Sequence, residues 1–486
     1  MKVKTLQRQL KDPFIISLLV ILLAGIFLRF FRFEGFVTFL GDQGRDALIM
    51  KRIVTLEHIP GVGAPSSIGH VFLGPFYYYF MAPWILLSGL NPIGPAIGVG
   101  IFSTLFIGIS YFVALDLFKK KTIALFMATA VAFSYILIWL SRFSWNPNLL
   151  PLFALLAVYT FIKALEESKL KYFVLSGLFF SFCIQFHYVA LASGLCVVGY
   201  MLWYLYKTRD LIMKSLINIF AMISSFIVGI LPLIVFDIRN DFINFKSFLG
   251  IFSEDQLVSS SRGIMEIFHT FAAFNEHALH ISAPTIIHAL FFIIMILATP
   301  RLIKGKKNYI HILVFFWITL FFTSYFTNNK HQHYFGFLYP LYYLILVGIL
   351  DTVISKKYLW MWAVPIVAFI VFQSQDYTFL RKPGSYQIRI AEKIAREIEK
   401  HITNDSYYLT SLPESVGDST ERYFLEIWGK KSQEKYTTER SEELFVLCEE
   451  LCSPVGNGQF DIALFAPKKV VGTWRVENVT IYKLIR

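Results

Sequence analysis

Long apolar runs recur along the first three quarters of the chain. Each holds roughly 17–25 residues, enough for a helix to cross a hydrocarbon core of about 30 Å. They predict eleven membrane-spanning helices, at about residues 14–32, 96–118, 122–140, 148–165, 172–187, 189–206, 215–236, 283–300, 309–326, 335–352 and 358–375. The expected fold class is therefore mostly α, a polytopic α-helical membrane protein with about eleven spans plus juxtamembrane helices.

The composition also favours a membrane protein over a soluble one. Of the 486 residues, 56% are hydrophobic and only 16% are charged, which lies outside the usual balance of a soluble globular domain. Aromatic residues make up 17% of the chain, and many Tyr and Trp residues stand near the ends of apolar runs, where they suit the membrane interface. The first run is long enough to be a full span, so we expect no cleaved signal peptide.

The formal net charge of +12 raises the question of nucleic-acid binding, so its distribution matters. From residue 377 onward, 16 basic residues balance 16 acidic ones, and the whole excess belongs to the membrane part. There, 19 of the 29 basic residues cluster in six short connections, at residues 2–11, 119–121, 163–171, 207–214, 301–307 and 356–357. Short basic connections favour the cytoplasmic side. We therefore expect a multi-pass protein of the cell membrane with a cytoplasmic amino terminus, and no nucleic-acid partner.

One apolar run, residues 71–90, does not fit this alternation. It contains Gly74, Pro75 and Pro83, and if it crossed the membrane every later basic connection would change sides. We expect a juxtamembrane or re-entrant helix packed against protein, where an irregular backbone can find hydrogen-bond partners. With this run excluded, an odd number of crossings places the tail of the chain outside the membrane.

Two long connections are predicted on that outer side, at residues 33–70 and 237–282. Connections of this length in a compact protein often carry function. The charge and hydropathy patterns divide the chain into a transmembrane domain over residues 1–376 and a small extracytoplasmic α/β domain over residues 377–486.

The tail has the composition of a soluble domain. Its apolar spacing predicts a helix at residues 386–402 and short strands at 444–448, 462–465 and 479–484. Cys448 and Cys452 in this region can be either bridged or free. Cys183 and Cys196 lie in apolar runs and are expected to be inert buried residues.

Candidate chemistry follows directly after the first span. The segment FLGDQGRD, residues 39–46, contains Asp42, Arg45 and Asp46. Apolar residues at helical spacing follow it. One interpretation is helix capping, because Asp favours the positive end of a helix. The other is a group of catalytic and binding residues on the outer membrane face.

An aromatic run closes the same connection. It reads HVFLGPFYYY, begins at His70 and includes Tyr78. With the acid after the first span, it resembles the GT-C superfamily of glycosyltransferases, in particular family 39, which includes protein O-mannosyltransferases and the aminoarabinose transferases of lipid A. In that family the first outer loop carries an acid at a helix start and then a His-Pro-Pro-Leu-like element that opens a juxtamembrane segment. The resemblance covers nearly the whole chain as architecture.

This resemblance implies roles for the first loop of a GT-C-like catalytic domain. Asp42 falls on the family's catalytic acid and is expected to act as the base. Arg45 matches a basic residue of some members and is expected to bind the donor phosphate. Asp46, His70 and Tyr78 are expected to bind substrate.

The first loop also departs from the family pattern at two places. Gln43 occupies the position where many members have a second acid. Gly74 and Pro75 follow His70 later than the His-Pro-Pro-Leu element requires.

A second segment, SRFSWNPN at residues 141–148, is similar to the family's arginine that precedes a proline and an aspartate. The resemblance implies that Arg142 binds the donor phosphate and that Asn148, in the place of the aspartate, binds substrate. The alternative is a proline-directed helix start capped by Asn146.

A third segment, KHQHYFGFLYP at residues 330–340, is similar to the family's element in which a basic residue and a Tyr open a span that contains proline. His333 fills the family's arginine position, and we expect Lys330 and His333 to bind the donor phosphate. Tyr334 is a candidate for substrate binding. His331 and His333 are also metal-ligand types, but no third ligand stands near them in the sequence.

His187 reaches the outer face between two predicted spans. An isolated His in such a place is often a hydrogen-bonded packing residue. We include it among the candidate substrate-binding residues.

The implied activity is inverting transfer of a hexosyl or pentosyl group from a polyprenyl-phosphate sugar donor to a glycan, lipid or protein acceptor. One carboxylate accepts the proton of the acceptor hydroxyl, and cations stabilise the leaving phosphate. No cofactor is expected and a divalent metal is not required. The other expected partner is membrane lipid.

Two other classes fit a polytopic chain. A transporter or flippase of lipid-linked intermediates needs ionisable residues deep inside its spans. Here the predicted span centres are nearly free of charge, and Asp116, Arg142 and Asp237 lie at span ends. A structural or sensory membrane protein does not need acids and an arginine in its first outer loop, so this loop favours the transferase.

Overall fold

The structure is a computed structural model of the chain. It describes residues 12–66, 71–253, 264–326, 330–354, 359–404, 406–434, 441–449 and 452–486.

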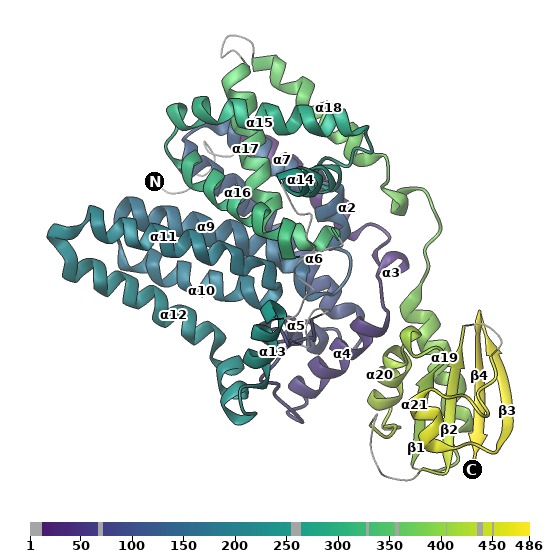
Figure 1. Ribbon diagram of the computed structural model, residues 1–486. Coiled ribbons are helices and arrows are strands. Elements are labelled where there is room, and N and C mark those ends of the chain that lie inside the picture. Colours follow the sequence, from purple (N-terminus) through teal and green to yellow (C-terminus); the bar gives the residue numbers. More distant parts are fainter. Residues whose placement is uncertain are drawn as a thin grey trace, which may run out of the picture.

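A bundle of apolar helices forms the part of the chain before residue 376 (Figure 1). In the described part of the chain, seven segments are long and apolar enough to cross a membrane, and they contain α2 (Pro13–Phe30), α6 (Ile93–Phe118), α9 (Leu150–Glu167), α11 (Ala192–Lys207), α12 (Ile212–Arg239), α15 (Thr285–Gly305) and α16 (Asn308–Phe326). Four shorter apolar helices complete the predicted set: α7 (Lys121–Phe133), α10 (Leu170–Phe186), α17 (Leu338–Val353) and α18 (Ala363–Ser374). The predicted polytopic helical fold is confirmed.

Ion pairs show which helix ends share a face of the bundle. Three pairs tie ends together: Lys121–Asp12, Lys120–Asp351 and Lys163–Asp116. The starts of α2 and α7 and the ends of α6, α9 and α17 therefore lie on one face, which we call the basic face. At the other end of α6, the hydroxyl of Tyr423 donates to the carbonyl of Leu90 at 2.6 Å. The carboxyl-terminal part therefore contacts the face opposite the basic face.

The apolar run at residues 71–90 forms the short helix α5 (Phe76–Leu87). Its 12 residues make it as short as α18, so the charge alternation and not its length separates it from the predicted spans. Met81 and Ile85 are fully buried against protein, whereas Leu87 is 77% exposed. This arrangement agrees with the predicted juxtamembrane helix.

The connections before and after this region contain helices of their own. The first holds α3 (Phe33–Phe36) and α4 (Gly41–Val54). The second holds α13 (Ile243–Ser253) and α14 (Ile264–Leu279). A further break divides the predicted span at 122–140, where Ser134 ends α7 and caps α8 (Tyr135–Leu140).

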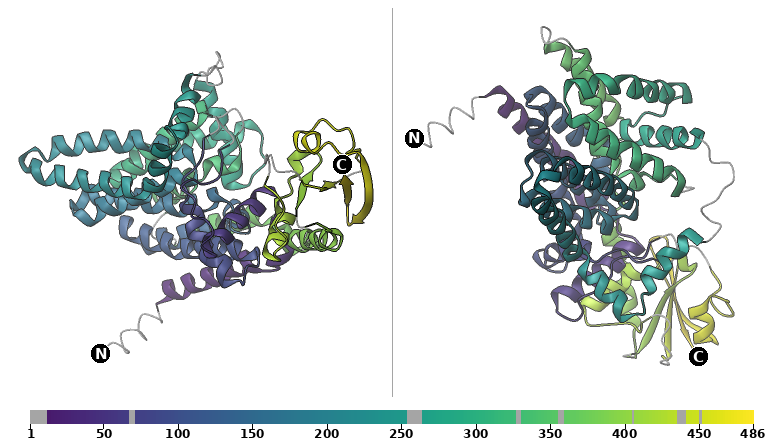
Figure 2. Two further views of the ribbon diagram at one scale, coloured as in Figure 1. Left: turned by 90° about the horizontal axis from the view of Figure 1, so that it is seen from below. Right: turned by 60° about the vertical axis from the view of Figure 1, so that its left-hand side comes forward.

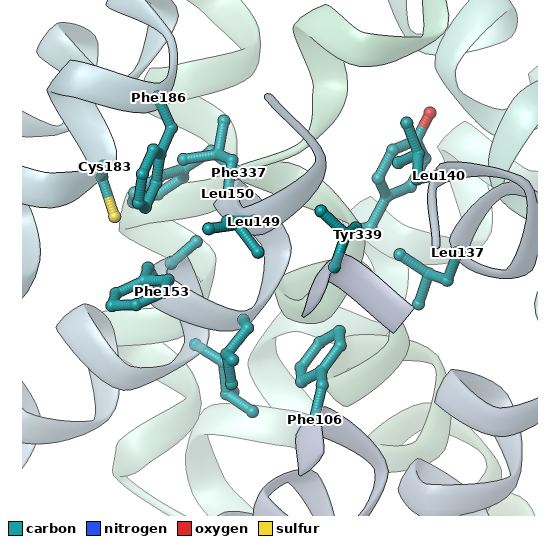
Figure 3. Close-up of a cluster of buried hydrophobic side chains, with 14 of the residues drawn as sticks. Phe106, Leu137, Leu140, Leu149, Leu150, Phe153, Cys183, Phe186, Phe337 and Tyr339 are labelled. Atoms are coloured by element: carbon teal, nitrogen blue, oxygen red, sulfur yellow. The ribbon is translucent and has the colours of Figure 1, made fainter. Parts of the chain in front are cut away.

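Aromatic and branched side chains fill the centre of the bundle. Figure 3 shows Phe153 of α9 beside Cys183 and Phe186 of α10, and the rings of Phe153 and Phe186 lie 5.1 Å apart. Phe106 of α6 and Tyr339 of α17 reach the same cluster (Figure 3). The core therefore joins helices that are far apart in the sequence and fixes the loops between them.

The carboxyl-terminal part stands beside the bundle, next to α4 (Figures 1 and 2). It contains α19 (Gln387–His401), β1 (Tyr407–Ser411), α20 (Ser419–Ile427), β2 (Glu443–Cys448), α21 (Phe460–Phe465), β3 (Lys469–Val476) and β4 (Val479–Ile485). The strand order is β1-β2-β4-β3, with β1 parallel to β2 and the other pairs antiparallel.

The predicted helix at 386–402 and two of the three predicted strands agree with this arrangement. The strand predicted at 462–465 is wrong, because these residues belong to α21. Ile462 and Phe465 are buried while the two residues between them are exposed, which is helical spacing that four residues could not distinguish from a strand. Cys448 and Cys452 form a disulfide.

Glu421 of α20 is expected to make stability depend on pH. It is 6% exposed and accepts a hydrogen bond from Thr420 Oγ1 at 2.8 Å, and burial raises its pKa from 4.5 to about 7. Between these values the folded chain keeps a proton that the unfolded chain releases, so stability falls as the pH rises through this window. Glu421→Gln should therefore raise stability at pH 8 by up to about 3 kcal/mol, and by much less at pH 5.

Thermal unfolding of both proteins at pH 5 and pH 8 checks this expectation. An equal effect of the substitution at the two pH values would contradict it.

Candidate active site

A pocket of about 400 Å³ opens where the first long connection meets the ends of several spans. Its polar end holds Asp42 and Arg45 of α4. The remaining lining comes from the segment before α5, the turn between α8 and α9, the turn between α10 and α11, the start of α11, α13, the end of α16 and the turn before α17. Those residues are Ala64, Pro65, Ser66, Leu73, Trp145, Asn146, Pro147, His187, Tyr188, Val189, Leu191, Ala192, Leu195, Phe248, Phe322, Thr323, His333 and Tyr334.

Helix α4 presents an acid, an arginine and a second acid on neighbouring turns. Arg45 Nη1 lies 2.8 Å from Asp42 Oδ1, and Arg45 Nη2 lies 2.8 Å from Asp46 Oδ1. The Asp42 side chain is 52% exposed, whereas that of Asp46 is 1% exposed. Asp42 can therefore meet a ligand in the pocket, while Asp46 holds the arginine from behind.

Asp46 is fixed in turn by the juxtamembrane helix. The hydroxyl of Tyr78 in α5 donates to Asp46 Oδ1 at 3.0 Å. Burial alone would lower the pKa of Arg45, but Asp46 and Asp42 raise it above its ordinary value. Arg45 therefore remains a cation at the polar end of the pocket.

Four rings form the next part of the wall. The ring of His333 lies 4.5 Å from Trp145 and 4.4 Å from Tyr334, and His187 lies 5.0 Å from Tyr334. Burial lowers the pKa of His187 to about 3, and burial with nearby His331 lowers that of His333 to about 4. Both imidazoles are therefore neutral at pH 7, and each can donate one N–H hydrogen bond.

Most of the remaining wall is apolar. Leu191 directly precedes α11, Ala192 and Leu195 lie in its first turn, and Phe322 comes from the end of α16. Leu195 is 53% exposed, so this side of the pocket faces the surroundings of the bundle. The pocket therefore runs from a charged end to an apolar end beside the membrane region.

The comparisons with known proteins agree with this architecture. A family model described as dolichyl-phosphate-mannose-protein mannosyltransferase matches residues 73–236. The structure of ArnT from Cupriavidus metallidurans matches in the apo state with a TM-score of 0.60 and 12% identity, and bound to undecaprenyl phosphate with a TM-score of 0.58 and 15% identity. Each match covers 97% of both chains. The chain has the GT-C glycosyltransferase fold.

A second solved structure with this fold also matches. It is the archaeal oligosaccharyltransferase AglB from Archaeoglobus fulgidus, in complex with an inhibitory peptide and a dolichol-phosphate. Its TM-score is 0.50 at 11% identity, and the match covers 90% of this chain and 69% of AglB. No curated protein sequence gives a significant match. The predicted resemblance to the GT-C superfamily is confirmed.

Within the GT-C fold, the pocket unites several predicted site residues. Asp42, Arg45, His187, His333 and Tyr334 all line it, although they come from three separate parts of the sequence. Two further candidates, Asp46 and Tyr78, lie directly behind Arg45.

Arg142 lies outside the pocket lining, and backbone carbonyls occupy the guanidinium that was predicted to bind the donor phosphate. Its guanidinium donates to the carbonyls of Leu28, Arg29 and Phe31 at 2.9–3.0 Å. It also stacks 4.3 Å from the ring of Phe379. These contacts join the end of α2 to the hairpin between α8 and α9. Arg142 therefore stabilises the start of the long connection that follows α2.

Lys330 and Asn148 also lie outside the pocket lining. Lys330 pairs with Glu266 at 3.2 Å. Asn148 is buried, and its side-chain amide donates to the carbonyl of Phe143 at 2.8 Å. His70 lies outside the described residues.

Sequence reasoning missed part of the lining. Trp145 and Asn146 stand in the same segment as Arg142, residues 141–148, and Tyr188 follows His187 directly. Asn146 donates to the carbonyl of Phe186 at 2.8 Å and does not cap the next helix. These residues could have been found from the sequence, because they lie at predicted turns between spans, next to residues that were predicted to belong to the site.

No group of three or more His, Cys, Asp or Glu side chains in the described part of the chain is arranged to hold a metal ion. His331 and His333 stack with ring centroids 5.7 Å apart.

Proposed function

We propose that this protein is a membrane glycosyltransferase that moves a sugar from a polyprenyl-phosphate donor to an acceptor hydroxyl. The observation that carries the proposal is that one pocket is lined by both Asp42 and Arg45 and by an apolar wall. Of the solved structures that share the fold, ArnT is bound to undecaprenyl phosphate and AglB is in complex with a dolichol-phosphate. A donor of this kind has a polar phosphate and an apolar chain, which match the two ends of the pocket.

The reaction is a single displacement at the anomeric carbon. The acceptor oxygen forms a bond to this carbon while the bond between the carbon and the phosphate oxygen breaks, which inverts the configuration. Asp42 accepts the hydroxyl proton, because its carboxylate is exposed to the pocket and is held by Arg45. The polyprenyl phosphate leaves as an anion.

A cation and two hydrogen-bond donors of the pocket can bind the leaving phosphate anion. Arg45 supplies a planar cation, and the N–H groups of His187 and His333 supply neutral hydrogen-bond donors. Since Arg45 can balance the leaving-group charge, the proposal includes no metal or other cofactor. Tyr334 and Trp145 provide ring faces for the sugar.

The pocket is placed on the extracytoplasmic side in this proposal. Short basic connections lie on the opposite face, and such connections favour the cytoplasm. The disulfide between Cys448 and Cys452 is typical of an oxidising compartment outside the cytoplasm.

Filling the apolar end of the pocket tests where the lipid binds. Ala192→Trp places an indole against the wall, so we expect the Kd for undecaprenyl phosphate to rise at least about tenfold. Leu202→Trp is the matched control, because Leu202 is on the same helix, is 64% exposed and lies outside the pocket. Native mass spectrometry of the purified proteins with this lipid measures both. Equal affinities for wild type and Ala192→Trp would contradict a prenyl chain in this pocket.

A further inference from the structure

Helix α4 contacts both the pocket and the carboxyl-terminal part. Asp42 and Arg45 line the pocket. Gly44 and Arg52 lie against α20 of the carboxyl-terminal part, on which α4 packs (Figure 1). The same short helix thus carries the proposed catalytic groups and the contact to the tail.

The contact is closest at Gly44. A Cβ atom added there would lie 2.5 Å from the amide nitrogen of Thr420 and 2.6 Å from the carbonyl carbon of Ser419. Both are backbone atoms at the start of α20, so no side chain can rotate away. Only glycine therefore allows the two helices this spacing.

A buried ion pair fixes the other end of α4. Arg52 Nε and Nη2 donate to the two carboxylate oxygens of Glu426 at 3.0 and 2.8 Å, and Lys51 Nζ lies 3.4 Å from the same carboxylate. The Glu426 side chain is 4% exposed. A bidentate arginine contact of this kind restricts both distance and rotation.

Aromatic and backbone contacts bracket the start of α4. Phe39 lies edge-on to Tyr423 and Phe424 of α20, with ring centroids 6.3 and 6.2 Å apart. The amide of Phe39 donates to the side chain of Gln387 in α19 at 2.7 Å. The tail thus contacts α4 before its first turn, at Gly44 and in its last turn.

We propose that α20 is a positioning element for the proposed reaction, which sets the place and rotation of α4 and thereby holds Asp42 and Arg45 at the pocket. The inference rests on the proposed function for its catalytic consequence. It assigns Gly44 and Glu426 as positioning residues, because neither lines the pocket.

Gly44→Ala tests this role, with Gly41→Ala as the matched control on the same helix. A Cβ at Gly41 would lie 3.9 Å from Gly417, an ordinary contact. Alanine favours a helix more than glycine does, so a defect in Gly44→Ala would oppose helix propensity. We expect kcat to fall at least about tenfold for Gly44→Ala, with KM for the lipid donor changed less than about threefold because α11 and α16 form the apolar wall. Gly41→Ala should stay within about twofold of wild type.

Hydrogen exchange of the α4 amides gives a readout independent of activity. We expect faster exchange in α4 for Gly44→Ala and for Glu426→Gln, which keeps the side-chain shape, and unchanged exchange in α9 and α10. If wild type transfers no sugar, the proposed function fails while the exchange data still decide whether α20 positions α4. Unchanged exchange in α4 for both variants, or wild-type kcat in Gly44→Ala, would overturn the proposal.

Discussion

Asp42→Asn is expected to lower kcat for sugar transfer by roughly 10²–10⁴-fold, because a positioned general base contributes about this much. The Asn side chain has the same shape and can still accept from Arg45, but it cannot take the acceptor proton. Helix α4 and its contacts to α5 should remain in place. The measurement is the initial rate of label transfer from a polyprenyl-phosphate sugar by purified protein in lipid vesicles.

Asp241→Asn is the control for this experiment. Asp241 is an acid of the second long connection that lies outside the pocket lining, and its backbone has φ of 52°, a conformation that Asn tolerates well. This variant should retain the wild-type rate. Activity of Asp42→Asn within about threefold of wild type would remove Asp42 from the base position.

Arg45→Gln is expected to produce the second large loss, of roughly 10²–10³-fold in kcat/KM, as for other donors that stabilise a developing anion. The substitution removes the cation from the polar end of the pocket. It also leaves Asp46, which is 1% exposed, without its ion-pair partner. The same vesicle assay at several donor concentrations separates the effects on kcat and KM.

Arg45→Lys distinguishes charge from geometry at this position. Lysine keeps the charge but cannot contact Asp42 and Asp46 through a planar fork. We expect it to recover only part of the lost activity. Full activity of Arg45→Gln would show that the donor phosphate binds elsewhere.

Much of the membrane fold could be predicted because its physical signals are local. Apolar runs and short basic connections located the apolar helices of the bundle, seven of which lie in segments of spanning length in the described part of the chain, and Pro83 with the charge alternation separated α5 from the predicted spans. The secondary structure of the carboxyl-terminal part was harder to predict. Four residues at 462–465 could not distinguish a strand from a helix, and β1 and β3 were not predicted.

The site residues were predictable only where the residues that interact are also close together in the sequence. Asp42 and Arg45 stand one helical turn apart, so their contact follows from local spacing. Arg142 and Lys330 offered the same cationic chemistry, but their partners are backbone carbonyls of α2 and the distant Glu266. Such partners depend on tertiary packing, as does the contact between Gly44 and α20. The sequence therefore suggested more cations for the phosphate than the pocket contains.

The most direct test of the account is to follow a labelled sugar on a polyprenyl-phosphate donor in vesicles that contain the purified wild-type protein. The account predicts that the label leaves the donor in the presence of acceptor, that free polyprenyl phosphate accumulates in equal amount, and that the new glycosidic bond has the inverted configuration. If instead the donor crosses the bilayer with its sugar still attached and no polyprenyl phosphate is released, the protein moves the lipid and the transferase account is contradicted.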